Sequence, residues 1–233
     1  MTDDLGPREG PIVLVVEDEP SMRGALEHLL TSAGYVVETF GSASELLARE
    51  PLTNAGCLIL DLHLPGASGL DLHDLLRSTG MEKATIFLSG RADVASSIRA
   101  MKSGAIDFLT KPVDRTELLS AVERALERDR MTRTYVEELS ELRRRAARLT
   151  PRELQVCALV ASGRLNKQIA ALIGTSEKTV KVHRARVLEK LEIDSLPELV
   201  RIVDRLGLRY RPEASWNAGD DIPPPRASGP STS

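Results

Sequence analysis

Residues 57–66 read Cys-Leu-Ile-Leu-Asp-Leu-His-Leu-Pro-Gly, a short apolar run that ends at one carboxylate and is followed by a turn signal. A run of four or five apolar residues is typical of a strand that is buried on both faces of a parallel sheet. Because Pro65 and Gly66 favour a turn, we expect Asp61 to lie where this strand ends and a loop begins. Open α/β sheets bind their ligands at this edge.

Apolar strand-like runs and helical patterns alternate on either side of this stretch. Four further strands are predicted, over residues 12–16, 35–39, 84–88 and 105–109, and amphipathic helices separate them. Five strands that alternate with helices over short loops predict a parallel sheet covered on both faces.

The carboxyl ends of the predicted strands carry a distinct set of polar side chains. Glu17 and Asp18 follow the first strand, Asp61 the third, Ser89 the fourth and Lys111 the fifth. Carboxylates held close together repel one another and favour a bound cation, and Mg²⁺ is the natural candidate because it prefers oxygen ligands. With a hydroxyl donor and an amine beside them, these groups fit a carboxylate that accepts a phosphoryl group, with Asp61 as the nucleophile.

The motifs at these strand ends are matched in order by a known family. They are Glu17-Asp18, Asp61 followed by Pro65-Gly66, Ser89-Gly90 and Lys111-Pro112. Over nearly all of residues 10–128 the chain resembles the receiver domain of two-component response regulators. The resemblance implies a flavodoxin-like strand order, a cis Lys111-Pro112 bond and phosphorylation of Asp61 by a histidine kinase.

The same resemblance implies roles for the neighbouring residues. Glu17, Asp18 and the main-chain carbonyl of His63 are expected to help Asp61 hold Mg²⁺, while Ser89 and Lys111 contact the phosphoryl group. Phe108 occupies the aromatic switch position of the family. A simple core position is the alternative for Phe108, because its neighbours Ile106 and Leu109 are apolar.

The net charge of −3 over 233 residues hides an asymmetry. Residues 1–113 contain 9 Lys and Arg against 16 Asp and Glu, a net charge of −7, whereas residues 150–212 contain 12 against 7, a net charge of +5. This asymmetry predicts that the second half binds a polyanion and the first does not. The chain is long enough for two domains, each with its own core.

Cysteine content and hydropathy suggest a cytoplasmic protein. Cys57 and Cys157 lie in apolar patterns without metal-ligand spacing, as small core residues do in a reducing compartment. No stretch approaches the ~20 apolar residues of a membrane span, so we expect no membrane partner.

A helical pattern begins with a capping box at Asp114-x-x-Glu117 and continues beyond the predicted receiver. Residues 128–148 contain no Gly or Pro, and apolar residues recur there at spacings of 4, 3, 4 and 3, namely Tyr135, Leu139, Leu142, Ala146 and Leu149. Two heptads fit a helical spacer that pairs in a dimer, and they fit equally a single solvated helix braced by i,i+4 ion pairs.

Four capped helices are predicted over residues 150–206. Their start signals are Thr150-Pro151-Arg152-Glu153, Asn166, Ser176 and Ser195-x-x-Glu198. The second and third helices are typical of a helix-turn-helix, with Ala170 for close approach, Gly174 in the tight turn and apolar Val180. The third helix has a basic face suited to the major groove of DNA, formed by Lys178, Lys181, Arg184, Arg186 and Lys190.

Three segments of this region resemble the four-helix output domain of the LuxR/NarL/FixJ class over residues 149–206. They are Leu-Thr-Pro-Arg-Glu at 149–153, Asn-Lys-Gln-Ile-Ala at 166–170 and Thr-Val-Lys-Val-His-Arg at 179–184. The resemblance implies that Lys181 and Val182 face base edges. It implies contacts near phosphates for Lys178, Arg184, Asn166 and Lys167.

Two points of this resemblance concern other positions. Ala185 stands where some members of the class have a lysine, so base readout there is expected to be apolar or absent. The fourth helix often pairs two DNA-binding domains, here through Leu199, Val203 and Leu206. A role in the core of the same domain is the alternative for these three residues.

The expected protein is an α/β receiver joined by a long helical linker to an all-α helix-turn-helix domain, closest to FixJ-like regulators. The segments are a flexible N-terminus at 1–10, the receiver at 11–128, the linker at 129–148, the DNA-binding domain at 149–210 and a disordered tail at 211–233.

We expect a phosphorylation-dependent transcription regulator and not an enzyme. A histidine kinase phosphorylates Asp61, the chain forms a homodimer, and the paired DNA-binding domains bind double-stranded DNA, with RNA polymerase as a further partner. One alternative is a receiver that mainly relays or hydrolyses phosphate. The other is DNA binding that does not depend on phosphate.

Overall fold

The computed structural model describes residues 11–49, 52, 54–90 and 94–210, which form two compact units. The first unit extends to Arg133 and the second begins at Thr134. The expected flexible N-terminus and disordered tail lie outside the described residues.

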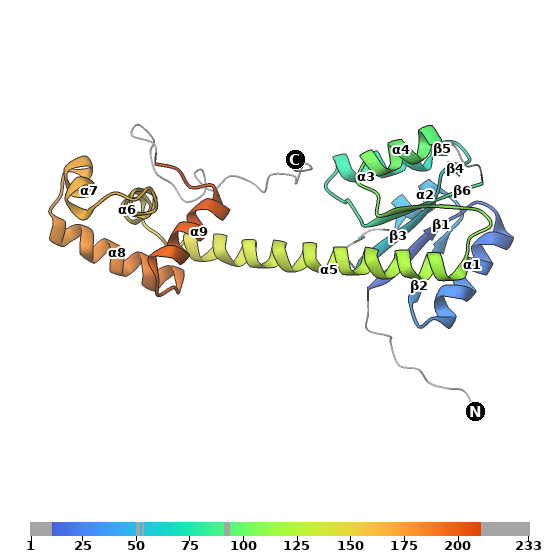
Figure 1. Ribbon diagram of the computed structural model, residues 1–233, viewed down its shortest axis with the longest axis horizontal. Coiled ribbons are helices and arrows are strands. Elements are labelled where there is room, and N and C mark those ends of the chain that lie inside the picture. Colours follow the sequence, from blue (N-terminus) through green and yellow to red (C-terminus); the bar gives the residue numbers. More distant parts are fainter. Residues whose placement is uncertain (1–10, 50–51, 53, 91–93, 211–233) are drawn as a thin grey trace, which may run out of the picture. The chain divides into compact units, whose positions relative to one another are not determined.

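The first unit alternates strands and helices, as the sequence predicts (Figure 1). Its elements are β1 (Ile12–Val16), α1 (Pro20–Ser32), β2 (Val36–Phe40), α2 (Ala43–Ala48), β3 (Ala55–Asp61), β4 (His63–Leu64), β5 (Ala67–Ser68), α3 (Gly69–Ser78), β6 (Thr85–Ser89), α4 (Val94–Lys102), β7 (Asp107–Thr110) and the first part of α5 (Arg115–Ala146).

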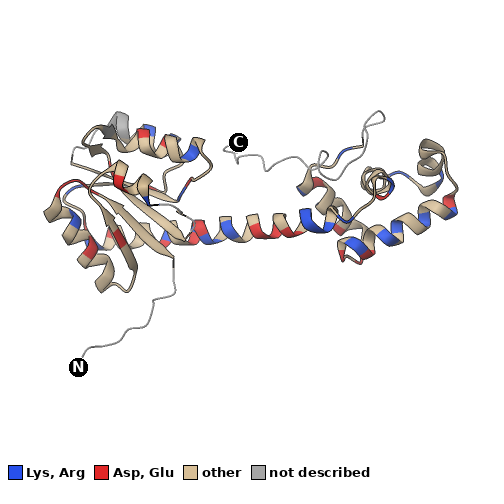
Figure 2. Cartoon of the chain, turned by 180° about the vertical axis from the view of Figure 1, so that it is seen from behind, with Lys and Arg blue, Asp and Glu red and all other residues tan. Residues whose placement is uncertain are grey.

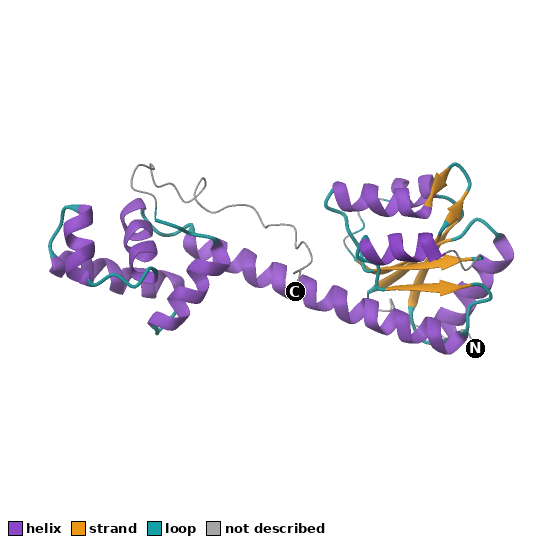
Figure 3. Ribbon diagram, turned by 45° about the horizontal axis from the view of Figure 1, so that its top comes forward, coloured by secondary structure: helices purple, strands orange, loops and turns teal. Residues whose placement is uncertain are grey.

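Five of these strands form one parallel sheet in the order β2-β1-β3-β6-β7. This order confirms the flavodoxin-like prediction. The sheet reverses its direction of growth at β1 and β3, so the carboxyl ends of these two strands flank the crevice where such sheets bind ligands. Figure 3 shows the strands side by side with helices around them.

The two faces of the sheet have separate cores because successive side chains of a strand point to opposite faces. On one face Leu14, Leu58 and Phe87 pack with residues of α2, α3 and α4. On the other face Val15 and Ile59 pack with residues of α1 and α5. Helices therefore cover both faces, which explains why the central strands are apolar throughout.

A short antiparallel hairpin, β4 and β5, follows Asp61 and was not predicted from the sequence. Gly66 makes the turn with φ +83°, a conformation that glycine adopts without strain. Ser68 then caps α3 by accepting a hydrogen bond from the Leu70 N–H. The hairpin leads the chain from the strand end directly into the next helix.

The second unit is helical and confirms the predicted all-α domain. It contains the end of α5, then α6 (Pro151–Ala161), α7 (Asn166–Ile173), α8 (Glu177–Leu191) and α9 (Leu196–Leu206). The predicted caps Thr150, Ser176 and Ser195 each accept a hydrogen bond from a main-chain N–H of the first turn. None of the described helices in either unit is both long and apolar enough to cross a lipid bilayer.

The later part of the apolar stripe of α5 and the stripe of α9 are buried in the core of the second unit, whereas Tyr135 at the start of the α5 stripe is 52% exposed. Leu139 and Ala146 of α5 pack there, followed by Leu149. Leu199 and Leu206 of α9 are only 2% and 1% exposed in the same core. Both stripes therefore serve intramolecular packing in this structure. Ion pairs such as Arg145 with Glu141 brace α5 along its length.

Candidate functional site

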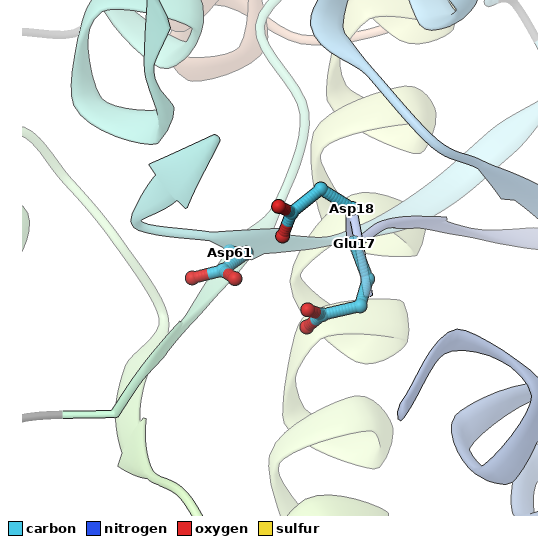
Figure 4. A group of neighbouring side chains, drawn as sticks. All are labelled: Glu17, Asp18 and Asp61. Carbon is cyan, nitrogen blue, oxygen red and sulfur yellow. The ribbon is translucent and has the colours of Figure 1, made fainter. Parts of the chain in front are cut away.

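Three carboxylates meet at the carboxyl ends of β1 and β3. Glu17 and Asp18 follow β1, and Asp61 is the last residue of β3. One oxygen from each lies within 4.8 Å of the others, and the three groups point toward a common space (Figure 4). Glu17 and Asp61 are buried, whereas Asp18 is exposed. The parallel topology thus assembles the acidic cluster that the sequence predicts.

Lys111 reaches this cluster from the end of β7. Its Nζ lies 2.7 Å from Oδ2 of Asp61, to which it donates a hydrogen bond, and 2.7 Å from Oε2 of Glu17. Its main-chain N–H donates to the carbonyl oxygen of Ser89 at 2.7 Å, and the Lys111-Pro112 bond is cis. Lys111 thus contacts two of the three clustered acids, and Ser89 is buried.

The two buried acids differ in their protonation behaviour. Burial raises the pKa of Glu17 above its usual value. The charge of Asp61 raises this pKa further, and Lys111 acts to lower it. Burial acts on Asp61 in the same direction. The His63 N–H, which donates to Asp61 Oδ1 at 3.0 Å, and Lys111 outweigh it and hold the pKa of Asp61 below its usual value. Asp61 is therefore ionised at neutral pH.

The cluster fits a divalent cation with oxygen ligands. Oε2 of Glu17 and Oδ2 of Asp61 share Lys111, whose Nζ lies 2.7 Å from each. Oε1 of Glu17 has no hydrogen-bond partner among the described residues. A buried carboxylate without such a partner is costly, and a bound Mg²⁺ would satisfy it. Asp18 and His63 line an adjoining cavity of about 580 Å³ that gives access to the cluster.

Gly69 is a site residue that the sequence reasoning missed. A Cβ atom built on Gly69 would overlap the main-chain oxygen of Asp61 and lie 3.1 Å from the Leu60 side chain. The Gly69 N–H also donates to the Leu62 carbonyl at 3.0 Å. The first turn of α3 therefore packs directly against the backbone of Asp61, and only glycine leaves room. A glycine that opens a helix just after a strand-end carboxylate is the signal for such close approach.

Phe108 lies next to the site in the sheet and is half-buried. It pairs in register with Phe87 of β6 and packs against the core on the α2, α3 and α4 face. This position fits both interpretations of Phe108, since a half-buried aromatic ring packs on a core and still has room to turn.

The second unit presents a basic surface on α8, visible as blue segments along this helix in Figure 2. Lys178, Lys181 and Arg186 are exposed, and the described part of the chain provides no ion-pair partner for them. Val182 is 45% exposed between them. Gly174, with φ +64°, ends α7 in the left-handed conformation and sets the turn into α8. The arrangement is that of a helix-turn-helix with a cationic second helix.

Two other predicted cations of α8 have partners inside the unit. Arg184 donates to Asn166 Oδ1 at 2.8 Å, which links α8 to the start of α7. Lys190 lies 2.6 Å from Glu153, a carboxylate only 2% exposed. The prediction that Asn166 caps α7 is wrong: Leu165 is the N-cap residue, and Gln168 Oε1 accepts its N–H. The Asn166 side chain is instead engaged with Arg184. Lys167 is exposed on the same turn.

Family models match both units. Residues 13–123 match the response regulator receiver domain, and residues 147–203 match the bacterial regulatory proteins of the luxR family. These two matches cover the acidic cluster and the helix-turn-helix respectively.

Several characterised proteins are similar over most of the chain. Nodulation protein W of Bradyrhizobium diazoefficiens is 44% identical over 84% of this chain and 87% of its own length. Transcriptional regulatory protein FixJ of Rhizobium meliloti is 38% identical over 82% of this chain and 93% of its own length. The solved structure of response regulator StyR, 41% identical, has a TM-score of 0.74 and covers 84% of this chain and 99% of that one.

Proposed function

The chain belongs to the response regulators that join a receiver domain to a LuxR-family DNA-binding domain, and on this premise we propose that a phosphoryl group on Asp61 controls its binding to DNA. It is a two-component transcription regulator and not a member of an enzyme class. The observation that carries the proposal is the meeting of three carboxylates with Lys111 at the carboxyl edge of the sheet.

Asp61 is the phosphoryl acceptor in this proposal. A carboxylate oxygen of Asp61 forms the new P–O bond while the P–N bond to a kinase histidine breaks, and the electron pair leaves with the imidazole nitrogen. The lowered pKa of Asp61 supports this role because the attacking carboxylate is already ionised. Lys111 moves its hydrogen bond from Asp61 to a phosphoryl oxygen, and the hydroxyl of Ser89 donates to another.

Glu17, Asp18, Asp61 and the main-chain carbonyl of His63 would hold Mg²⁺ beside this carboxylate. When bound, the ion offsets the negative charge of the transferring phosphoryl group. Oε1 of Glu17 supports the assignment, since this buried oxygen has no hydrogen-bond partner among the described residues and Glu17 lies beside the other two carboxylates.

The output step is a change in association. Rearrangement around Ser89 and Phe108 stabilises a receiver surface that favours a homodimer, and the phosphoryl group shifts this equilibrium only by its differential stabilisation of the two states. We assign the receiver to residues 11–128, the helical connection to 129–148 and the DNA-binding domain to 149–210.

Two such DNA-binding domains then bind a two-fold-related site on double-stranded DNA. Lys181 and Val182 face base edges, and their exposure on α8 supports this. The residues near phosphates are Lys178, Lys167 and the linked pair Arg184 and Asn166. A histidine kinase and RNA polymerase are the protein partners, and the cytoplasm is where a regulator of transcription meets both.

Mass spectrometry of the intact protein tests the phosphorylation step. The full chain is incubated with Mg²⁺ and acetyl phosphate, and we expect the mass to increase by one phosphoryl group. The Asp61→Asn variant should gain none, and chelation of Mg²⁺ should abolish the reaction of the wild type. Equal labelling of wild type and variant would contradict the assignment of Asp61.

A further inference from the structure

Arg23 on α1 binds the backbone of the loop that carries Glu17 and Asp18. Its Nη1 donates to the carbonyl oxygen of Glu17 at 2.7 Å and to that of Asp18 at 3.1 Å. The described residues contain no other side-chain hydrogen bond to the main chain of these two acids. Arg23 is half-buried, so its contacts are partly shielded from water.

The surroundings leave room for this contact. A Cβ atom built on Gly41 would lie 3.3 Å from Arg23 Nη1, so a larger residue there would crowd the guanidinium group. Glu45 accepts the Gly41 N–H at 2.7 Å and holds this turn in place. On the opposite side of the loop, the Glu17 N–H donates to the Phe40 carbonyl at 3.0 Å. The backbone of Glu17 is thus fixed through both its N–H and its carbonyl.

The start of α1 gives the loop little other support. Its N-cap residue, Glu19, accepts no main-chain N–H with its side chain, and Pro20 has no N–H to donate. The exposed Asp18 would therefore move with an unrestrained loop. Arg23 restrains this loop in another way, by donating to the two carbonyl oxygens just before the helix.

Arg23 donates to the carbonyl oxygens of Glu17 and Asp18 and not to their carboxylates, and this arrangement is compatible with a metal site. A guanidinium paired with the carboxylates would compete with a cation for the same oxygens. Bound to the carbonyls, it orients both acids and leaves their carboxylate oxygens available. We infer that Arg23 is a positioning residue for a divalent cation, which it serves by holding Glu17 and Asp18 at the end of β1. This inference rests on the proposed Mg²⁺ site.

Mg²⁺ titration of the unphosphorylated full-length protein by calorimetry tests the inference. Arg23→Met removes the donors and keeps the apolar stem, while Arg23→Lys keeps the charge and one donor group. Arg77→Met is the matched control, because Arg77 Nη1 donates to a carbonyl, that of Ser103 at 3.1 Å, remote from the acids. Thermal unfolding without Mg²⁺ reports any general loss of stability in each variant.

We expect Arg23→Met to weaken Mg²⁺ binding by about 10-fold or more, the usual effect of losing a group that orients metal ligands. Arg23→Lys should recover part of the affinity, and Arg77→Met should bind Mg²⁺ like the wild type. Equal Mg²⁺ affinity of Arg23→Met and wild type would overturn the positioning role while the metal site stands. A wild type that binds no Mg²⁺ would overturn the metal site and this inference together.

Discussion

Asp61 and Glu17 are neighbouring buried carboxylates whose pKa values move in opposite directions. Asp61 receives hydrogen bonds from the His63 N–H and from Lys111, and these outweigh the effect of burial. Burial dominates for Glu17, although Lys111, with Nζ 2.7 Å from Oε2 of Glu17, acts in the opposite direction. Asp61, which is proposed to attack phosphorus, is therefore kept ionised. Glu17 keeps one buried oxygen, Oε1, without a hydrogen-bond partner among the described residues.

The close approach of Gly69 to Asp61 gives a prediction about packing. Gly69→Ala places a methyl group against the Asp61 carbonyl, and we expect a loss of about 1–3 kcal/mol in stability together with slower phosphorylation. Chemical denaturation and phosphoryl incorporation measure the two effects. Gly24→Ala on α1 is the control, because nothing lies within 4 Å of its new Cβ, and it should stabilise by about 0.5–1 kcal/mol. Equal effects of the two substitutions would contradict the prediction.

His73 gives a prediction about pH. It is 2% exposed and meets the ring of Phe87 edge-on. Burial lowers the pKa of His73 below the ordinary 6.5, and the charge of Arg77 also lowers it. Asp74 and Glu82 act to raise this pKa but do not outweigh burial. The unfolded chain thus binds a proton more readily than the folded one. The contribution of His73 to stability is complete above pH 6.5 and decreases as the pH falls below it.

Thermal unfolding between about pH 5 and 7.5 checks this, since these values bracket the histidine titration. We expect His73→Leu to flatten the acid side of the stability profile relative to the wild type. His28→Gln, at an exposed histidine, is the control and should leave the profile unchanged. A profile of His73→Leu that falls as steeply as that of the wild type would refute the assignment.

At the scale of elements, α5 belongs to both units. Its first part packs on the sheet through residues such as Leu118 and Val122, and its last part packs with α6, α8 and α9 through Leu139 and Ala146. Arg205 of α9 pairs with Glu138 at 2.9 Å, which adds a polar contact to this packing. The residues just before α6 are thus part of the folded DNA-binding unit.

Leu139→Ala tests this assignment of the linker residues. Since Leu139 is 5% exposed in the core of the second unit, we expect a loss of about 2–5 kcal/mol there. Hydrogen exchange should show reduced protection of the α6 and α9 amides, with the sheet unaffected. Met131→Ala, at a position 58% exposed, should change protection by no more than about 0.5 kcal/mol. Normal protection in Leu139→Ala, with a change in self-association alone, would favour an intermolecular pairing.

The basic residues of α8 separate into two roles that salt dependence distinguishes. Lys178→Ala should weaken binding to a DNA duplex and reduce the slope of log affinity against log salt by about 1. Lys190→Met should leave that slope unchanged and destabilise the second unit by about 1–3 kcal/mol, because Glu153 stays buried without its partner. A slope that falls in Lys190→Met and stays unchanged in Lys178→Ala would contradict both assignments.

Sequence patterns predicted which strands form more accurately than the residues at which these strands begin. Strands were expected from Tyr35 and Ala105, but the N–H groups of these residues close the ends of α1 and α4 by bonding to Leu30 and Ala100. The strands therefore start later, at Val36 and Asp107. Apolar periodicity does not distinguish a residue in such a helix-ending turn from the first residue of a strand.

The sequence predicted the site residues that follow strands. It did not predict the residues that reach the site by packing against the main chain of another segment. Glu17, Asp61 and Lys111 follow apolar runs and were recognised for that reason. Arg23 and Gly69 act through main-chain atoms of other segments. Arg23 leaves no motif at the strand ends, and the signal of Gly69, a glycine that opens a helix after a strand-end carboxylate, was not used. The apolar stripe of α5 was visible, but periodicity does not specify whether its partner lies in the same chain.

In the whole molecule, an acidic receiver is joined to a basic DNA-binding unit. The charge asymmetry read from the sequence, −7 in residues 1–113 and +5 in residues 150–212, is divided between these two units. The acidic unit has little attraction for DNA, so the basic unit is expected to make the DNA contacts.

The central claim is that phosphorylation of Asp61 drives dimerisation and DNA binding. Sedimentation and DNA binding are measured for the wild type and Asp61→Asn, each with and without Mg²⁺ and acetyl phosphate, on a duplex selected from a random pool. We predict that the donor converts the wild type to a dimer and tightens its DNA binding, and that Asp61→Asn responds in neither assay. Equal DNA binding and one unchanged oligomeric state for both proteins would contradict the claim.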